Sequence, residues 1–172
     1  PRLGRERSKW LYPIGTLQRS GARVGFGSDW YVTSVNPLDG IEAAVTRLDP
    51  NGLTDVPLGA DEEISLAEAI ENYTINSAYV NFLDDQVGSI EVGKKADLVI
   101  LDKNLFAIPA QEINSTKVVA TLFAGCLVYL SNHSDNSSDD RNPALEQLFC
   151  DSSTSSRKAI TSSGDVDGGQ YE

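Results

Sequence analysis

Residues 22–30 read Ala-Arg-Val-Gly-Phe-Gly-Ser-Asp-Trp. This stretch predicts a short strand over residues 22–27, in which two glycines indicate a close backbone approach or a sharp turn. Asp29 follows at the carboxyl end of that strand, where barrel and doubly wound folds place catalytic groups. An aspartate at a strand end also serves as a helix cap or turn residue, and the residues alone leave both roles open.

Helical patterns surround this strand, and a β-rich part follows. Helices are predicted over residues 14–20, 38–47, a stretch that opens at residue 65, and 78–82. The signals are apolar periodicity, turn residues and a Ser-x-x-Glu capping box at residues 65–68. Strands are predicted over residues 96–102, 117–124 and 126–130. The order indicates a mixed α/β protein with a β annex.

Length and charge exclude several classes of protein. The 172 residues suit about one domain of ~150 residues and leave no room for a complete (β/α)8 barrel of about 250 residues. The formal net charge of −11 argues against a nucleic-acid partner. No apolar run approaches the ~20 residues of a membrane span. A start at Pro1 and the absence of methionine favour a fragment or processed piece.

Metal-ligating and nucleophilic residues are scarce. His133 is the only histidine, whereas metallohydrolase sites usually need three or more protein ligands. Cys126 and Cys150 lack the CxxC spacing of zinc sites. The sequence is compatible with one disulfide between them or with two unpaired thiols. We therefore expect the chain to contribute to chemistry that it does not perform alone.

Two motifs in a fixed order carry a family resemblance. The first is Gly-Ser-Asp-Trp at residues 27–30, and the second is Gly-Ser-Ile-Glu-x-Gly-Lys-x-Ala-Asp-Leu-Val at residues 88–99. Together with the segments 36–47 and 66–74, they resemble the C-terminal portion of the metal-dependent amidohydrolase superfamily, amidohydrolase-3 branch. The likeness covers about residues 10–130. Tyr31 departs from it, since relatives often have proline there.

The resemblance implies a C-terminal fragment of a (β/α)8 TIM barrel plus part of a small β-sandwich annex. Residues 1–87 would form the last strand and helices of the barrel, and residues 88–130 would form strands of the composite β-sandwich. Residues 131–172 contain ten serines and eight acidic residues with few large apolar side chains, which predicts a disordered tail.

The resemblance also implies the site residues. Asp29 matches the family's aspartate after the eighth strand, which ligates metal and handles the proton of the attacking water. Ser28 and Trp30 would shape the substrate pocket, and Asn36 and Arg47 are candidates for its rim, with helix capping and a surface charge as equal alternatives. The implied cofactor is one or two divalent metal ions, commonly zinc, with most ligands outside this chain.

The predicted function is that of the C-terminal part of a metal-dependent hydrolase acting on carbon–nitrogen bonds other than peptide bonds. Its partners would be a small amide-like substrate and the missing N-terminal part of the same protein, with no nucleic acid and no membrane. The 172-residue chain alone is expected to be inactive and unstable. The alternative is a truncated, non-catalytic interaction module with a flexible acidic tail.

Overall fold

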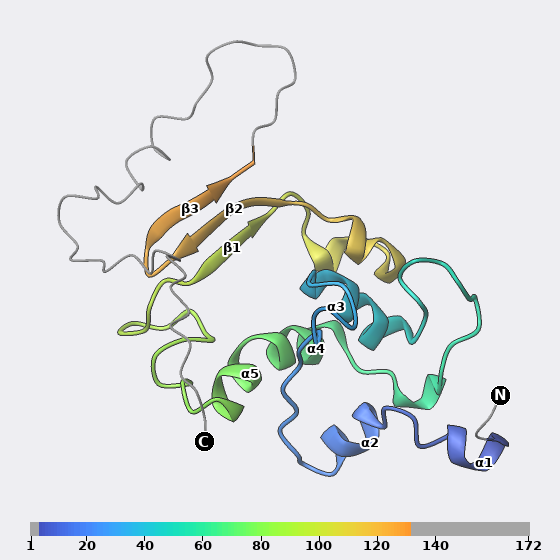
Figure 1. The fold of residues 1–172 in the computed structure, drawn as a ribbon. Helices are drawn as coiled ribbons and strands as arrows, with labels where there is room; N and C mark the ends of the chain where they lie inside the picture. The colour runs from blue at the N-terminus through green and yellow to red at the C-terminus, as the bar shows by residue number, and fades with distance from the viewer. Residues whose placement is uncertain (1–3, 132–172) are drawn as a thin grey trace, which may run out of the picture.

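A computed structural model describes residues 4–131 of the 172 (Figure 1). The predicted acidic tail, apart from Ser131, lies outside the described residues, as do His133 and Cys150. In chain order the elements are α1 (Gly4–Ser8), α2 (Ile14–Arg19), α3 (Pro37–Thr46), η1 (Ala60–Glu62), α4 (Leu66–Tyr73), α5 (Ile75–Val80), β1 (Leu98–Leu101), η2 (Leu105–Ala107), η3 (Ala110–Ser115), β2 (Val118–Phe123) and β3 (Cys126–Leu130).

The predicted α/β class is confirmed, because the helices come first and a three-stranded antiparallel sheet in the order β1-β2-β3 follows. The turn between β2 and β3 takes positive φ at Ala124 and Gly125. Asp97 Oδ1 accepts the Ala124 N–H at 2.6 Å, and the Gly125 N–H donates to the Ala96 carbonyl at 3.0 Å. Asp97 therefore stabilises the turn between β2 and β3.

Local sequence signals explain where the helices begin. The Asn36 side chain accepts the Leu38 N–H at 3.2 Å, and Pro37 occupies the first turn of α3. At α4 the predicted capping box is present: Ser65 accepts the Glu68 N–H, and the Glu68 carboxylate accepts the Ser65 N–H at 2.7 Å. Both helix starts are thus fixed by side chains adjacent in sequence.

The core forms around α3, and a segment from the β-rich part completes it. Figure 1 shows η3 beside α3. The buried apolar residues of this cluster are Leu38, Ile41, Ala44, Ile64, Ala69, Leu105 and Ile113. The buried Glu42 carboxylate accepts the Asn114 N–H at 2.8 Å, and Asn114 Nδ2 donates to the Pro50 carbonyl at 2.8 Å. The helical part and the segment leading into β2 therefore share one core.

The strand predicted over residues 22–27 is not formed. This segment is extended but pairs with no other strand of residues 4–131. The Phe26 N–H donates instead to the Asn72 carbonyl of α4 at 2.9 Å. A strand requires a neighbouring strand for its ladder, and the described chain offers helices at this place.

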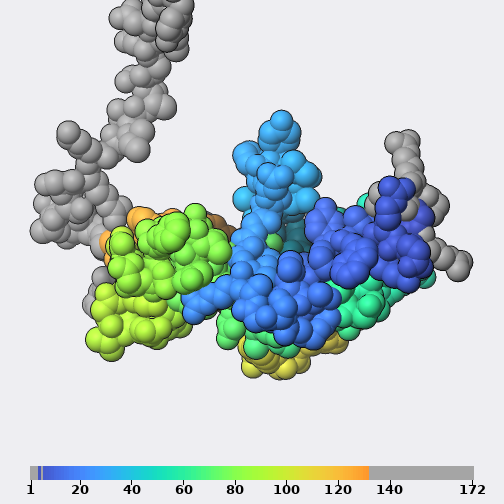
Figure 2. All heavy atoms as spheres, turned by 90° about the horizontal axis from the view of Figure 1, so that it is seen from below, coloured from blue at the N-terminus to red at the C-terminus, as the bar shows by residue number. Residues whose placement is uncertain are grey.

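After this segment the chain projects from the body of the molecule. Figure 2 shows the projection in light blue. Trp30 and Tyr31 are 69% and 87% exposed, and Val32 is 73% exposed. Within residues 4–131, every helix is too short or too polar to cross a membrane.

Candidate functional site

Asp29 lies in a turn at the base of this projection. Its φ of +50° is in the left-handed region, which aspartate adopts more readily than most residues. The Val32 N–H donates to the Asp29 carbonyl at 2.7 Å, and the Thr33 hydroxyl donates to the Ser28 carbonyl. These bonds fix the turn through its backbone, so the exposed Asp29 carboxylate is not used to build it.

A cavity of about 760 Å³ opens between the extended segment and α3. Ser28 lies on its wall, together with Val24 and Phe26. Asp29 and Trp30 are not among its lining residues and are exposed on the projecting turn. The structure therefore separates the three predicted site residues into one at the cavity and two beside it.

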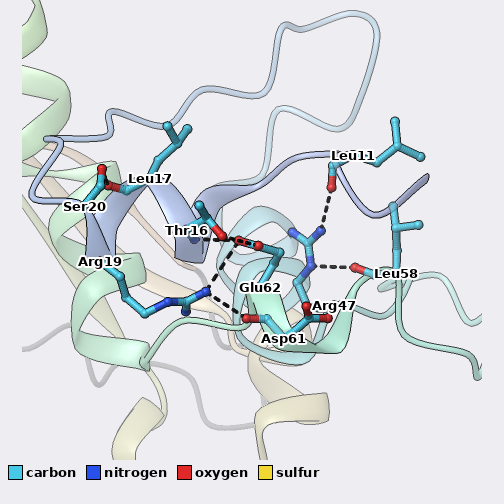
Figure 3. Close-up of polar contacts among 9 residues, drawn as sticks. All are labelled: Leu11, Thr16, Leu17, Arg19, Ser20, Arg47, Leu58, Asp61 and Glu62. Carbon is cyan, nitrogen blue, oxygen red and sulfur yellow. Dashed lines mark hydrogen bonds and ion pairs between the residues drawn. The ribbon is translucent and has the colours of Figure 1, made fainter. Parts of the chain in front are cut away.

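Both rim candidates line the cavity, and both also have structural roles. Asn36 caps α3, and its Nδ2 donates to Asp39 Oδ1 at 3.0 Å. Arg47 is only 8% exposed, so it is not a surface charge. Its Nε donates to the Leu58 carbonyl at 2.8 Å and its Nη2 to the Leu11 carbonyl at 3.2 Å (Figure 3). Arg47 thereby fastens two distant segments to the end of α3.

Two residues that the sequence did not single out as site residues face the same cavity. Tyr73 and Asp39 both line it. Burial, and then the negative charge of Asp39, raise the pKa of Tyr73, so its phenol stays protonated and can donate a hydrogen bond. The Phe26 ring lies edge-on to the Tyr73 ring, with centroids 5.3 Å apart. Gly40, a glycine inside a helical pattern, is the sequence signal for this contact, because its missing side chain leaves room for the Tyr73 hydroxyl.

The Glu62 carboxylate of η1 holds α2 in place. Glu62 accepts the Thr16 N–H at 2.6 Å and the Thr16 hydroxyl at 2.5 Å, and Arg19 lies 3.9 Å away (Figure 3). The two Thr16 hydrogen bonds are the main cause that lowers the pKa of Glu62, and Arg19 and Arg47 add to it. This network joins α2 to η1.

The described residues do not fit a complete metal site. Nowhere in residues 4–131 do three or more His, Cys, Asp or Glu side chains gather in a way that could hold a metal ion. Protein metal sites usually use three or four such ligands. Asp29 could supply one of them, so no reaction step through a metal follows from this part of the chain.

Comparison with known proteins agrees with the resemblance seen in the sequence. The family model described as "Amidohydrolase family" matches residues 1–129. The chain is 37% identical to Protein LONG AFTER FAR-RED 3 of Arabidopsis thaliana, over 74% of this chain and 22% of that protein. It is 32% identical to the N-substituted formamide deformylase of Arthrobacter pascens, over 69% of this chain and 21% of that protein.

A solved structure gives the same result. An uncharacterized metal-dependent hydrolase from Pyrococcus horikoshii superposes with a TM-score of 0.53 and 31% identity, covering 61% of this chain and 21% of that one. The chain thus spans about a fifth of the length of these proteins. The predicted resemblance is confirmed: the chain belongs to the amidohydrolase family.

Proposed function

We propose that the chain is the C-terminal part of a metal-dependent hydrolase that acts on carbon–nitrogen bonds other than peptide bonds. The observation that carries the proposal is the family match over residues 1–129, which includes the Gly-Ser-Asp-Trp motif. The relative named as a formamide deformylase supports the bond class. Because the chain spans only about a fifth of its relatives, the activity belongs to a longer protein.

In this proposal Asp29 is the proton-transferring residue. Its carboxylate accepts a proton from the water whose oxygen attacks the substrate carbon, and it then delivers that proton to the departing nitrogen. One carbon–oxygen bond forms and one carbon–nitrogen bond breaks, so the same carboxylate ends the reaction unprotonated. The exposed turn of Asp29 supports this role because it leaves the carboxylate accessible to water and substrate.

The implied divalent metal, commonly zinc, would take Asp29 as one ligand and its other ligands from parts of the protein outside this chain. Ser28 and Trp30 would contact the substrate, a small amide-like molecule. Ser28 already lines the cavity, and the exposed indole of Trp30 is available for such a contact.

The proposal extends to the architecture. Residues 1–87 would belong to a (β/α)8 barrel, residues 88–130 to a β-sandwich, and residues 131–172 to a tail. Support comes from apolar side chains on the sheet that the described chain leaves 45–58% exposed: Val99, Ile100, Phe123, Val128 and Tyr129. Val99, Phe123 and Tyr129 lie on one face, because Val99 and Tyr129 both pair with Thr121 and Phe123 is two residues further along β2. A second sheet from outside this chain would cover that face.

The test is Asp29→Asn in the whole protein. Release of amine or ammonia is measured on N-substituted formamides, amides, lactams and carbamates. We expect kcat to fall by about 10²- to 10⁴-fold, the usual contribution of a general acid–base group. Asp85→Asn, at an exposed loop position, is the matched control and should keep full activity. Near-normal turnover of Asp29→Asn would remove Asp29 from the proposal.

Two measurements on the native protein separate the hydrolase from an interaction module. The hydrolase requires stoichiometric divalent metal and an intact mass severalfold larger than 18.6 kDa. An intact mass near 18.6 kDa, with no bound metal, contradicts the hydrolase and favours the interaction module.

A further inference from the structure

The segment that leads to Asp29 is held at Phe26 by α4 and α5, through the Asn72 backbone carbonyl and the Ser77 hydroxyl. The Phe26 N–H donates to the Ser77 hydroxyl oxygen at 3.1 Å, and the same oxygen lies 2.9 Å from the Phe26 carbonyl oxygen. The Ser77 oxygen of α5 therefore accepts from the Phe26 N–H, and its single hydrogen is shared between two acceptors, the Phe26 carbonyl and the Asn72 carbonyl. The N–H and the carbonyl of Phe26 are the two groups that a paired strand would otherwise bond.

The contact is anchored at the junction of α4 and α5. The Asn72 carbonyl accepts the Phe26 N–H at 2.9 Å and lies 2.6 Å from the Ser77 hydroxyl oxygen. Asn72 is fully buried, and its side-chain amide bonds Gln18 at 3.1 Å and Asn76 at 2.9 Å. Asn72, whose carbonyl accepts the Phe26 N–H, is thus held in place by hydrogen bonds to Gln18 and Asn76.

Close approach and ring contacts reinforce the same contact. A Cβ atom at Gly25 would lie 2.9 Å from Val80 Cγ2, so only glycine lets the segment approach α5 this closely. Two residues before Gly25, the Arg23 guanidinium lies 4.1 Å from the centre of the Tyr79 ring. The segment is therefore docked along α5 by several contacts, of which the Ser77 hydroxyl is the central polar one.

We propose that Ser77 is a positioning residue for Asp29, acting through the backbone of Phe26 three residues earlier. The inference rests on the proposed function. Residues 29–31 are exposed and project from the molecule, and the turn bonds of Asp29 and Ser28 are made within this projection. The position of Asp29 therefore depends on where the preceding segment is held. Shifts of about 1 Å in catalytic groups lower rates by about a hundredfold.

The test compares Ser77→Ala with Thr74→Ala in the whole protein. Thr74 donates its hydroxyl to the Ile70 carbonyl at 2.7 Å, so the control removes a similar hydrogen bond without touching the extended segment. We expect backbone amides of residues 24–29 to exchange hydrogen about fivefold faster in Ser77→Ala, as loss of one hydrogen bond predicts, and unchanged in the control.

The kinetic signature separates positioning from general stability. Ser77→Ala should lower kcat by about tenfold or more with little change in KM, and Ser77→Thr, which keeps the hydroxyl, should restore both kcat and the slow exchange. If Ser77→Ala does not fold, Gly25→Ala should displace the segment in the same way, and the double variant Gly25→Ala/Val80→Ala should relieve the contact and restore kcat.

Two outcomes overturn the inference, and each is distinct from failure of the proposed function. Unchanged exchange at residues 24–29 in Ser77→Ala overturns the docking role, whatever the activity. Faster exchange with unchanged kcat overturns the positioning role. Full activity of Asp29→Asn instead refutes the role of Asp29 in the reaction, and faster exchange in Ser77→Ala then still supports the docking contact itself.

Discussion

The core around α3 and the three-stranded sheet differ in how much of their apolar surface the described residues cover. In the core, Ile113 is 1% exposed and Ala69 is fully buried. On the sheet, Val99 is 55% exposed and Tyr129 is 49% exposed, although both belong to regular strands. Residues in regular strands are therefore not all buried by the described chain. The same substitution should change the free energy of unfolding by different amounts in the two regions.

The largest effect should come from Ile113→Ala. Removing a buried isoleucine side chain creates a cavity, and we expect the free energy of unfolding to fall by about 2–5 kcal/mol. Ile100→Ala is the matched control on the sheet, where the side chain is 45% exposed, and it should lower stability by less because it leaves no closed cavity. Urea titration followed by circular dichroism at 222 nm measures both. Equal effects at the two positions would break the comparison.

A second substitution tests how tightly the core side of the cavity is packed. Gly40→Ala should gain up to about 1 kcal/mol of helix propensity but lose about 1–3 kcal/mol by overpacking, because the new Cβ would lie 1.9 Å from the Tyr73 hydroxyl oxygen. Because the loss by overpacking exceeds the gain in helix propensity, we expect the free energy of unfolding to fall by about 1 kcal/mol.

The background Tyr73→Phe removes the clashing hydroxyl and gives the control. There Gly40→Ala should be less destabilising in the same urea titration, because the hydroxyl at 1.9 Å is gone while the ring carbon Cζ at 2.7 Å remains. If Gly40→Ala is as destabilising with Phe at position 73 as with Tyr, the close packing of α3 on α4 is not the reason for the glycine.

The smallest effect should be pH-dependent and confined to α2. Hydrogen bonds from Thr16 lower the pKa of Glu62 in the folded protein below its ordinary value of 4.5. The stabilisation is therefore complete above pH 4.5 and is lost as the pH falls through the lowered pKa. In Glu62→Gln the stability should depend less steeply on pH below 4.5 than in the unchanged protein.

Urea titrations between pH 3 and pH 7, at intervals of about half a unit, measure this dependence. Glu71→Gln, at an exposed position of α4, is the matched control and should leave the slope unchanged. An identical slope in Glu62→Gln and the unchanged protein would show that the Glu62–Thr16 contact contributes nothing to acid stability.

Features fixed by neighbouring residues could be predicted from the sequence. The Asn36 cap, the capping box at Ser65 and the β2–β3 turn at Gly125 all form as expected, because each depends on side chains a few residues apart. A second helix after the one that opens at Ser65 was predicted, but over residues 78–82, whereas α5 spans Ile75–Val80. The break between α4 and α5 falls at Thr74, a residue that carries no strong turn signal, so its position could not be predicted.

Features that depend on distant residues could not be predicted in the same way. The strand expected at residues 22–27 lacks a strand beside it in the described chain, so the sequence pattern alone overestimates it. Ser28 lines the cavity, and its role toward a substrate stays a prediction. The meeting of Asp39 with Tyr73 requires two helices to pack. The catalytic role of Asp29 rests on family resemblance and stays a prediction.

The bond between Glu42 and Asn114 has a consequence for synthesis of the protein. It joins residues 72 positions apart, so the apolar face of α3 leaves the ribosome long before η3 can cover it. At the usual 5–20 residues per second, the delay is about 4–14 s. During that interval the apolar side chains of α3, Ile41 among them, are open to chaperones and to contact with other nascent chains.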